Sequence, residues 1–352
     1  MLSPRPRRLG NTLMVGAVAL ALALATQPQV STPRDNAVTE AQGKIALSAA
    51  TTCGAMAKYA PRCGTLWGVY TLQNGNPEQS VRRLETEVGR KFDLTLRYHD
   101  FSDHQHQGNF PDYYERRLGA DHTLFLSWQA RVSDTNRNIS WRAIANGYYD
   151  RFINRAATQV KAHARPVFIA FDPEFDTHTT KGTMADYVAA YRRVVNKFRG
   201  YGVTNVAWAW VSSGYLGAGN DAKIQAGYPG DSYVDWVGWD PFNFYRCNGT
   251  TWKTFGPKVT PTYNWMKANG HGDKPFLLSE YGTQYGSSTL TKQWYDGIPG
   301  ALRSLPNLKA MVRFDSNGTF RSTKCGFYIK NGYGALPAFA QAGKAVQAGL
   351  VR

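Results

Sequence analysis

The chain has 352 residues, with 41 Lys and Arg against 25 Asp and Glu, and a formal net charge of +16 at pH 7. No repeat with a period of about 20–50 residues is present, which excludes a solenoid. The basic residues are scattered along the chain, which favours a basic protein whose charge aids solubility or adhesion to anionic cell walls over a nucleic-acid binder; a basic nuclease-like protein is the minor alternative.

The first 25 residues are typical of a secretory signal peptide. Arg5, Arg7 and Arg8 precede an uncharged apolar run, Leu13–Ala25, which ends on small residues. The run is about 13 residues long, too short for a bilayer that needs about 20. We therefore expect a secreted, extracellular protein without a membrane span. Residues 26–52, rich in small and polar types, are interpreted as a flexible leader.

Eight short apolar runs alternate with amphipathic segments in the remaining 53–352. The runs are Thr65–Tyr70, Asp93–His99, His122–Trp128, Pro166–Asp172, Asn205–Val211, Asp235–Asp240, Pro275–Glu280 and Ala310–Asp315. Helical patterns include Glu78–Gly89, Tyr148–Ala164, Met184–Arg199, Thr262–Asn269 and Leu336–Leu350. Continuous apolar runs indicate parallel strands buried on both faces. This alternation predicts an α/β fold, a single (β/α)8 TIM barrel; a doubly wound sheet is disfavoured because the first turn lacks a Gly-rich phosphate motif.

The four cysteines predict disulfide bonds, because an exported protein with an even number of cysteines commonly pairs them. We favour Cys53 with Cys63 and Cys247 with Cys325 among the three possible pairings. A zinc site is the alternative, but no two cysteines have CxxC spacing. His104 and His106 lack an evident third ligand. We expect no metal and no cofactor.

Polar and aromatic residues stand at the carboxyl ends of the predicted strands, where a (β/α)8 barrel carries its active site. Indole rings stack on the apolar faces of sugars. The predicted substrate-binding residues are Asp100, Trp128, Asp172, Trp210, Trp239, Asp240, Phe242 and Tyr281.

Two carboxylates are the strongest catalytic candidates. Glu174 lies two residues past the fourth run, and Glu280 ends the seventh. Strands four and seven face each other across a barrel axis, so two carboxyls there can approach the roughly 5–5.5 Å of a retaining glycosidase. We predict Glu280 as nucleophile and Glu174 as general acid/base, its pKa raised by apolar Phe171 and Phe175.

From about Leu66 to Phe314 the sequence resembles glycoside hydrolase family 26. The matching pieces are LWGVYT, ARPVFIAFDPEFD, NVAWAWV, YPGDSYVDWVGWDPFN and KPFLLSEYGT. The resemblance implies the same acid/base and nucleophile positions. It also implies a β-polysaccharide substrate, with mannan first and mixed-linkage β-glucan or β-1,3-xylan as further members of the class.

Three positions depart from the family pattern. Pro173 stands where a His usually precedes the acid, and the Asn-Gly that often follows is replaced by Phe175-Asp176-Thr177-His178. Phe242 replaces a Tyr that supports the nucleophile. The resulting prediction is a monomeric, retaining endo-β-glycanase. The alternative is a non-catalytic carbohydrate-binding barrel.

Overall fold

The computed structural model describes residues 57–73, 75–102, 110–320, 323–329 and 334–346. The predicted signal peptide 1–25 and leader 26–52 lie outside the described residues, as do Cys53, His104 and His106. The predictions made for these segments therefore stay predictions.

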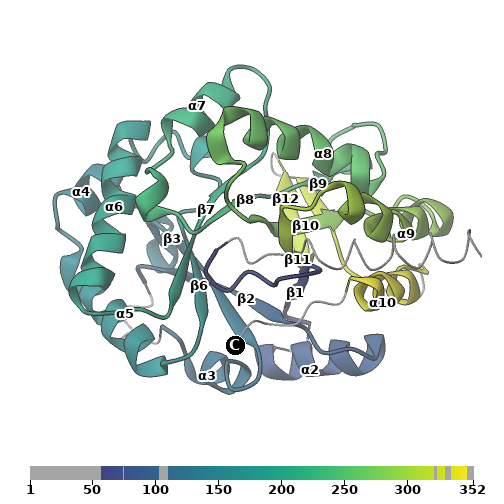
Figure 1. The fold of residues 1–352 in the computed structure, drawn as a ribbon, viewed down its shortest axis with the longest axis horizontal. Coiled ribbons are helices and arrows are strands. Elements are labelled where there is room, and N and C mark those ends of the chain that lie inside the picture. Colours follow the sequence, from purple (N-terminus) through teal and green to yellow (C-terminus); the bar gives the residue numbers. More distant parts are fainter. Residues whose placement is uncertain (1–56, 74, 103–109, 321–322, 330–333, 347–352) are drawn as a thin grey trace, which may run out of the picture. The chain divides into compact units, whose positions relative to one another are not determined.

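Eight parallel strands close into a barrel, as the sequence predicts (Figure 1). In ring order they are β1 (Leu66–Thr71), β2 (Leu94–Asp100), β3 (Thr123–Gln129), β6 (Val167–Phe171), β7 (Val206–Ser212), β8 (Trp236–Trp239), β10 (Phe276–Thr283) and β11 (Leu308–Asp315). The ring closes because β11 pairs with both β10 and β1. The short β9 (Phe242–Asn243) extends β10 at its carboxyl end.

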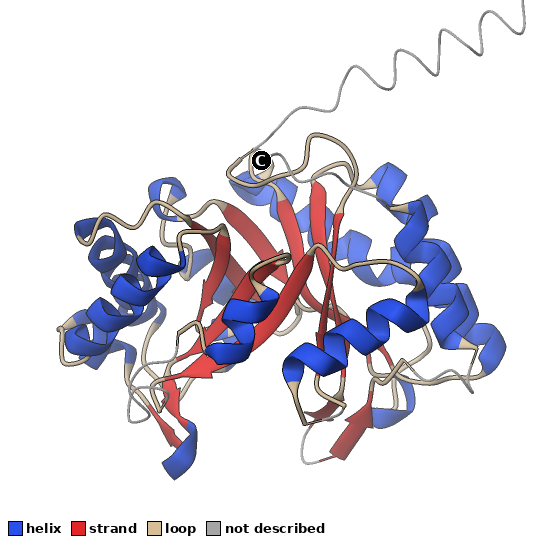
Figure 2. Cartoon of the chain, turned by 90° about the horizontal axis from the view of Figure 1, so that it is seen from below, coloured by secondary structure: helices blue, strands red, loops and turns tan. Residues whose placement is uncertain are grey.

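Helices surround this barrel and follow most of its strands (Figure 2). They are α2 (Pro77–Val88), α3 (Tyr113–Leu118), α4 (Trp141–Ala145), α5 (Asp150–His163), α6 (Met184–Gly200), α7 (Asn220–Ala226), α8 (Phe255–Met266), α9 (Ser288–Ser304) and α10 (Ala335–Ala345). Shorter helical turns are η1 (Ser133–Thr135), η2 (Phe175–Thr177), η3 (Asp231–Tyr233), η4 (Tyr245–Cys247) and the π-type η5 (Lys267–His271).

Two separate hydrophobic cores follow from the period-two alternation of each strand. On β7, the small residues Ala207 and Ala209 face the barrel axis, where they join Leu94, Phe168 and other residues of the inner core. Their neighbours on the same strand belong to the larger core between barrel and helices. A residue's parity along its strand thus decides whether it fills the barrel or packs against a helix.

One predicted helix was placed too late in the chain. The pattern suggested Thr262–Asn269, whereas α8 spans Phe255–Met266 and contains Pro261 in its interior. Gly270 adopts a left-handed φ of 89°, which ends regular helix in the following turn. Packing of buried residues such as Phe255 and Tyr263 stabilises the earlier turns despite the proline.

A disulfide joins Cys247 in η4 to Cys325, confirming that half of the predicted pairing. Cys325 lies on β13 (Thr323–Gly326), which pairs with β12 (Asn317–Phe320) in a hairpin beyond β11. A second small hairpin, β4 (Arg131–Val132) with β5 (Arg137–Asn138), follows β3. Both hairpins extend the carboxyl-terminal side of the barrel.

Within the described ranges, none of the helices combines the length and apolar character needed to cross a bilayer. The same residues contain no cluster of three or more His, Cys, Asp or Glu side chains suited to hold a metal ion.

Candidate active site

The chain leaves β6 through two residues with left-handed backbone. Asp172 has φ 45° and Glu174 has φ 55°, conformations that non-glycine residues seldom adopt. The strands on either side hold this turn, because the Asp172 amide donates to the Trp128 carbonyl at 2.8 Å and the Glu174 amide donates to the Val211 carbonyl at 3.1 Å. Hydrogen bonds to the neighbouring strands therefore fix the backbone position of Glu174 at the carboxyl end of the fourth strand, as expected.

Asp172 does not face substrate, so its predicted binding role is wrong. The side chain is fully buried and accepts hydrogen bonds from the Ala130 amide at 2.9 Å, Trp141 Nε1 at 2.6 Å and Lys181 Nζ at 2.6 Å. Burial would raise the pKa of Asp172, but the hydrogen bonds and charges of His178 and Lys181 outweigh it and lower the pKa to about 2. Asp172 is an ionised buried anchor beneath the turn that carries Glu174.

The ammonium of Lys181 also contacts His178. Lys181 Nζ lies 3.2 Å from His178 Nδ1, and an ammonium offers donors only. The same Nδ1 lies 3.6 Å from Asp172 Oδ2, so His178 joins the buried ion pair of Asp172 and Lys181. The ring remains partly exposed next to Glu174, and its charge lowers the pKa of that carboxyl.

A bulge in β10 sets the position of Glu280. Between Leu278 and Tyr281 the pairing with β11 shifts, so three steps along β10 match two along β11. Such an extra residue re-aims side chains. Ser279 Oγ and the Glu280 amide both donate to Asp240 Oδ1, the latter at 2.8 Å. Asp240, at the end of β8, thus supports the backbone that presents Glu280.

Tyr98 provides the hydrogen bond that the carboxylate of Glu280 receives. Its hydroxyl, at the end of β2, donates to Glu280 Oε1 at 2.5 Å. Sequence reasoning missed this residue. The signal was present, because Tyr98 is an aromatic residue with a polar tip at the carboxyl end of a predicted strand.

Three carboxyl groups share one electrostatic environment. Burial, followed by the charge of Asp176, raises the pKa of Glu174. Burial also raises the pKa of Glu280 to about 8, with the charge of Glu174 adding to the shift and the Tyr98 hydrogen bond opposing it. Burial and the charges of Glu280 and Glu174 raise the pKa of Asp240 well above its ordinary value. The structure therefore brings the two predicted catalytic glutamates within electrostatic reach of each other.

Asp176 fixes the segment that follows Glu174. It is buried and accepts hydrogen bonds from the Ser213 amide and hydroxyl and from Asn220 Nδ2 at 2.6 Å. These contacts bind η2 to the loop after β7. Glu174 is only partly exposed, and no described side chain donates a hydrogen bond to its carboxyl group.

The four predicted aromatic sugar contacts at strand ends lie in the core instead. Trp128, Trp210, Trp239 and Tyr281 are at most 3 % exposed and belong to the core between barrel and helices. Parity along the strand turns the three tryptophans outward from the barrel axis, and the bulge of β10 does the same for Tyr281. Trp210, for example, donates from Nε1 to the Gly227 carbonyl at 3.0 Å. The prediction that these four residues contact sugar considered only their position at strand ends and not the face of the strand they occupy. The structure contradicts it.

Asp100 and Phe242 lie nearer the surface. Asp100 accepts from the Ser102 amide at 2.7 Å and the Ser133 amide at 3.0 Å, so it also organises loops. Phe242 is partly exposed and packs with Phe314 and Phe327 in a small aromatic cluster that also contains Tyr98. Contact of Asp100 or Phe242 with a sugar stays a prediction.

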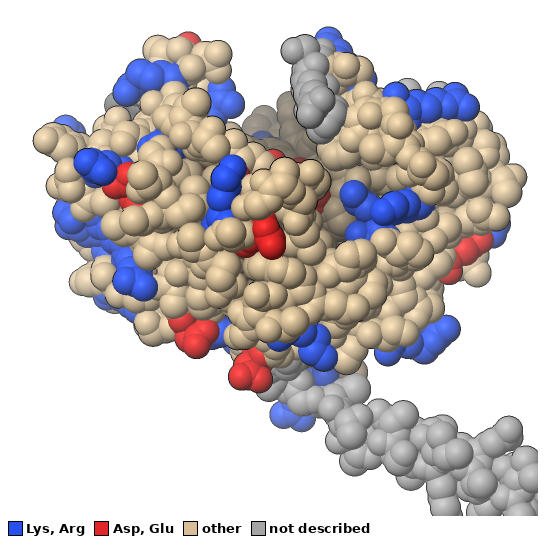
Figure 3. Space-filling view, turned by 90° about the horizontal axis from the view of Figure 1, so that it is seen from above, with Lys and Arg blue, Asp and Glu red and all other residues tan. Residues whose placement is uncertain are grey.

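Exposed aromatic residues at the carboxyl-terminal side are tyrosines rather than tryptophans. Tyr215 follows β7 and is 61 % exposed, and Tyr285 follows β10 and is 37 % exposed. Neither was singled out from sequence, because both lie in loops past the strand ends. A hollow in the surface, with acidic side chains visible inside it, is seen in Figure 3.

Comparison with known proteins shows what this barrel is similar to. The family model described as "Glycosyl hydrolase family 26" matches residues 176–307, a range that includes Glu280 and begins two residues after Glu174. Endoglucanase H of Acetivibrio thermocellus is 25 % identical over 227 residues, covering 58 % of this chain and 23 % of that protein. Beta-1,3-xylanase TXYA of a Vibrio species is 25 % identical over 156 residues, covering 44 % of this chain and 32 % of that protein. The matches thus span about a quarter to a third of these relatives.

Solved structures share the fold. A family 26 β-mannanase from Bacteroides ovatus superposes with a TM-score of 0.58 at 16 % identity, covering 80 % of this chain and 88 % of that one. An endo-β-1,4-mannanase from Cellulomonas fimi gives a TM-score of 0.60 at 16 % identity, covering 79 % and 70 %.

The closed barrel, with glutamates at the carboxyl ends of its fourth and seventh strands, has the fold of solved mannanases and is similar in sequence to glycoside hydrolases. The match to the family 26 model extends over residues 176–307, less than half of the chain, so this part of the barrel is similar to that family.

Proposed function

We propose that this protein hydrolyses β-glycosidic bonds inside a neutral polysaccharide with net retention, with Glu280 as nucleophile and Glu174 as general acid/base. The observation that carries the proposal is the placement of the two carboxyl groups. Both lie at the carboxyl ends of barrel strands, and their charges act on shared neighbours: Glu174 raises the pKa of Glu280, and both raise the pKa of Asp240. A retaining glycosidase needs two such groups near one another.

The hydrogen bonds divide the roles between the two groups. Below about pH 8 the pair keeps one proton. Tyr98 donates to Glu280 and stabilises its ionised form, whereas no described side chain donates to Glu174. We therefore place the proton on Glu174. Ionised Glu280 then attacks the anomeric carbon while Glu174 protonates the departing oxygen; afterwards Glu174 takes a proton from the water that releases the sugar.

The relatives' names indicate the substrate class. Those matched by sequence are named an endoglucanase and β-1,3-xylanases, and those matched by structure are named mannanases. We propose mixed-linkage β-glucan and β-1,3-xylan beside mannan, because the sequence matches carry more information on substrate than fold similarity at 16 % identity.

Release of reducing ends from these three polysaccharides tests the proposal. Parent protein should cleave at least one, and NMR of early product should show the β-anomer. Glu280→Ala should abolish release. Glu174→Ala should slow polysaccharide cleavage by about 10²–10⁴-fold, and much less with an activated aryl leaving group that needs no protonation. Glycan binding without cleavage by the parent would instead favour a non-catalytic carbohydrate-binding barrel.

We also propose that the protein is exported. The basic start and short apolar run support this, and the Cys247–Cys325 disulfide is typical of proteins that fold in an oxidising compartment. Secretion of a reporter fused after residue 52, and its loss when Leu13–Ala25 is deleted, tests this export.

A further inference from the structure

A broad groove lies between α2 and α3 on the outer wall of the barrel, away from the glutamate pair. Its volume is about 660 Å³. Its lining residues are Asn76, Glu78, Gln79, Arg82, Arg83, Thr86, Tyr113, Tyr114 and Arg117. None of them has a role in the proposed hydrolysis.

The upper end of the groove lies on the catalytic side of the barrel. Helices in this fold run antiparallel to the strands, so their amino-terminal ends share a side with the strands' carboxyl ends. Asn76 caps α2 five residues after β1, and Tyr113 is the first residue of α3. The connection before Asn76 also touches the mouth, because Gln73 donates to Asp315 at the end of β11.

Two exposed tyrosines provide an aromatic surface. Tyr113 is 61 % exposed and Tyr114 is 37 % exposed, and their rings meet edge to face with centroids 5.3 Å apart. Two adjacent exposed rings offer a continuous aromatic surface, and rings of this kind stack on the apolar faces of sugars.

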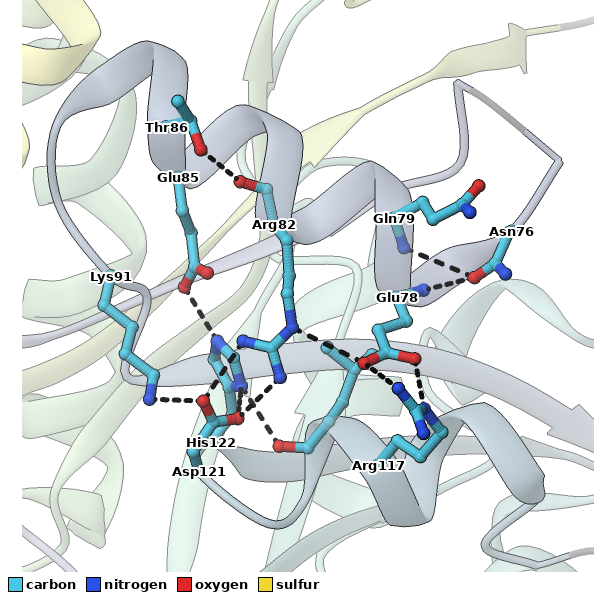
Figure 4. Close-up of polar contacts among 11 residues, drawn as sticks. Asn76, Glu78, Gln79, Arg82, Glu85, Thr86, Lys91, Arg117, Asp121 and His122 are labelled. Carbon is cyan, nitrogen blue, oxygen red and sulfur yellow. Dashed lines mark hydrogen bonds and ion pairs between the residues drawn. The ribbon is translucent and has the colours of Figure 1, made fainter.

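The arginines of the groove are already neutralised within the protein. Arg82 pairs with Asp121 at 3.1 Å, and Arg117 pairs with Glu78 at 2.5 Å (Figure 4). Arg83 pairs with Glu87 at 2.9 Å. The hydrogen bond from Arg117 lowers the pKa of Glu78, as expected for a carboxylate committed to its partner. The groove therefore offers little net attraction to an anionic ligand.

Neutral hydrogen-bonding groups remain unused beside the tyrosines. Asn76 Oδ1 accepts from the Glu78 and Gln79 amides, which leaves its amide NH₂ without a partner among the described residues. The side-chain amide of Gln79 extends from α2 without a drawn contact (Figure 4). Amide groups beside aromatic rings are the chemistry that recognises sugar hydroxyls and sugar faces together.

We propose that this groove binds a neutral β-glycan chain as a second site, holding polysaccharide on the wall of the barrel while the chain is cut at the mouth. This inference rests on the proposed function for the ligand class, but not on the catalytic glutamates.

Affinity electrophoresis in native gels containing each soluble polysaccharide tests the groove. Proteins carry Glu280→Gln to prevent cleavage, and Tyr113→Ala/Tyr114→Ala is compared with Tyr148→Ala, which removes a 79 % exposed tyrosine elsewhere. The double variant should bind the retarding polysaccharide about 5- to 50-fold more weakly, as the loss of two stacking contacts implies. Gln79→Ala should weaken binding less, and Tyr148→Ala should not change it.

Two comparisons separate this inference from the proposed hydrolysis. With Glu280 present, the tyrosine variants should cleave short aryl oligosaccharides within about twofold of the parent, while their KM for polysaccharide rises. Unchanged retardation in the double variant would overturn the second site even if hydrolysis is intact. If polygalacturonate, an anionic polysaccharide, retarded the protein through the two tyrosines and added salt removed this retardation, the proposal that the ligand is neutral would be wrong.

Discussion

Tyr98 is the residue whose contact most directly affects the proposed nucleophile. Its hydroxyl donates to Glu280 Oε1, and this is the hydrogen bond that opposes the effect of burial on the pKa of Glu280. The family pattern has a tyrosine where this chain has Phe242, and Phe242 lies in the same aromatic cluster as Tyr98. The hydroxyl of Tyr98, on β2, thus donates to the carboxylate of Glu280, to which Phe242 has no hydroxyl to donate.

Tyr98→Phe should reduce kcat by about 10- to 100-fold, the effect of losing one hydrogen bond to a charged group. Removing a donor to the ionised form raises the pKa of Glu280, so the acidic limb of the kcat/KM profile should move to higher pH. Tyr70→Phe, which changes an adjacent ring 4.8 Å from Tyr98, is the matched control. An unaltered pH profile in Tyr98→Phe would show that the contact has no influence on the nucleophile.

Lys181 compensates a charge that cannot reach water. Asp172 is fully buried, and Lys181 is 4 % exposed with its ammonium 2.6 Å from Asp172 Oδ1. Lys181→Met should lower the free energy of unfolding by about 3–5 kcal/mol, because one buried charge is left unpaired. Lys181→Met/Asp172→Asn should recover part of this loss. Denaturant unfolding of both variants measures the difference, and a single variant within about 0.5 kcal/mol of the parent would contradict the argument.

At the scale of elements, the hairpin β12–β13 is held to η4 by the Cys247–Cys325 disulfide. The two cysteines are 78 residues apart, so the bond restricts a long loop of the unfolded chain. Its removal in Cys247→Ser/Cys325→Ser should cost up to about 4 kcal/mol. The aromatic cluster with Phe242 and Phe327 should loosen at the same time, because Cys325 is buried within it.

Unfolding by denaturant under oxidising conditions measures this cost. Parent protein in reductant is the control, since it should approach the stability of the double variant. Equal stability of oxidised and reduced parent would mean that packing of Phe314 and Phe327 alone fixes the hairpin.

The strands were predictable because each is buried on both faces. Predicted Pro166–Asp172 and observed Val167–Phe171 differ by a residue at each end, and continuous apolar residues gave the signal. Helix α8 begins at Phe255 instead of the predicted Thr262, because packing of residues such as Phe255 and Tyr263 stabilises a helix that contains Pro261. The bulge of β10 was not predictable, since it depends on how Leu278 and Tyr281 pair with β11.

The direction of a side chain at a strand end was also only partly predictable from the sequence. Glu174 and Glu280 were predictable as charges at the ends of apolar strands, where burial alone gives no reason for a carboxylate. Trp210 and Trp239 were misassigned because a strand-end position does not state which face a side chain takes. Tyr98 acts through a partner distant in sequence, Glu280, which no local pattern shows.

For the molecule as a whole, the site carboxyls reduce stability as pH rises. The pKa of Glu280 is raised from 4.5 to about 8, by burial first and then by the charge of Glu174. Between these values the folded protein holds a proton that the unfolded chain has released. The unfolded state therefore binds fewer protons, and the free energy of unfolding falls as pH rises through this window. Asp172 acts oppositely, since its lowered pKa of about 2 gives stability that is lost only as pH falls toward 2.

Glu280→Gln should therefore stabilise the protein while removing activity. The Tm difference from the parent should be smallest near pH 4.5, where about half of the unfolded chains still bind this proton, and should reach about 2–4 °C at pH 8. Glu174→Gln should behave in the same direction, because burial and the charge of Asp176 raise the pKa of Glu174. Thermal unfolding of parent and both variants from pH 4.5 to 8.5 measures the effect. A Tm difference that does not widen with pH would show that these carboxyls ionise in the folded protein without penalty, and the proton placed on Glu174 would then have no support.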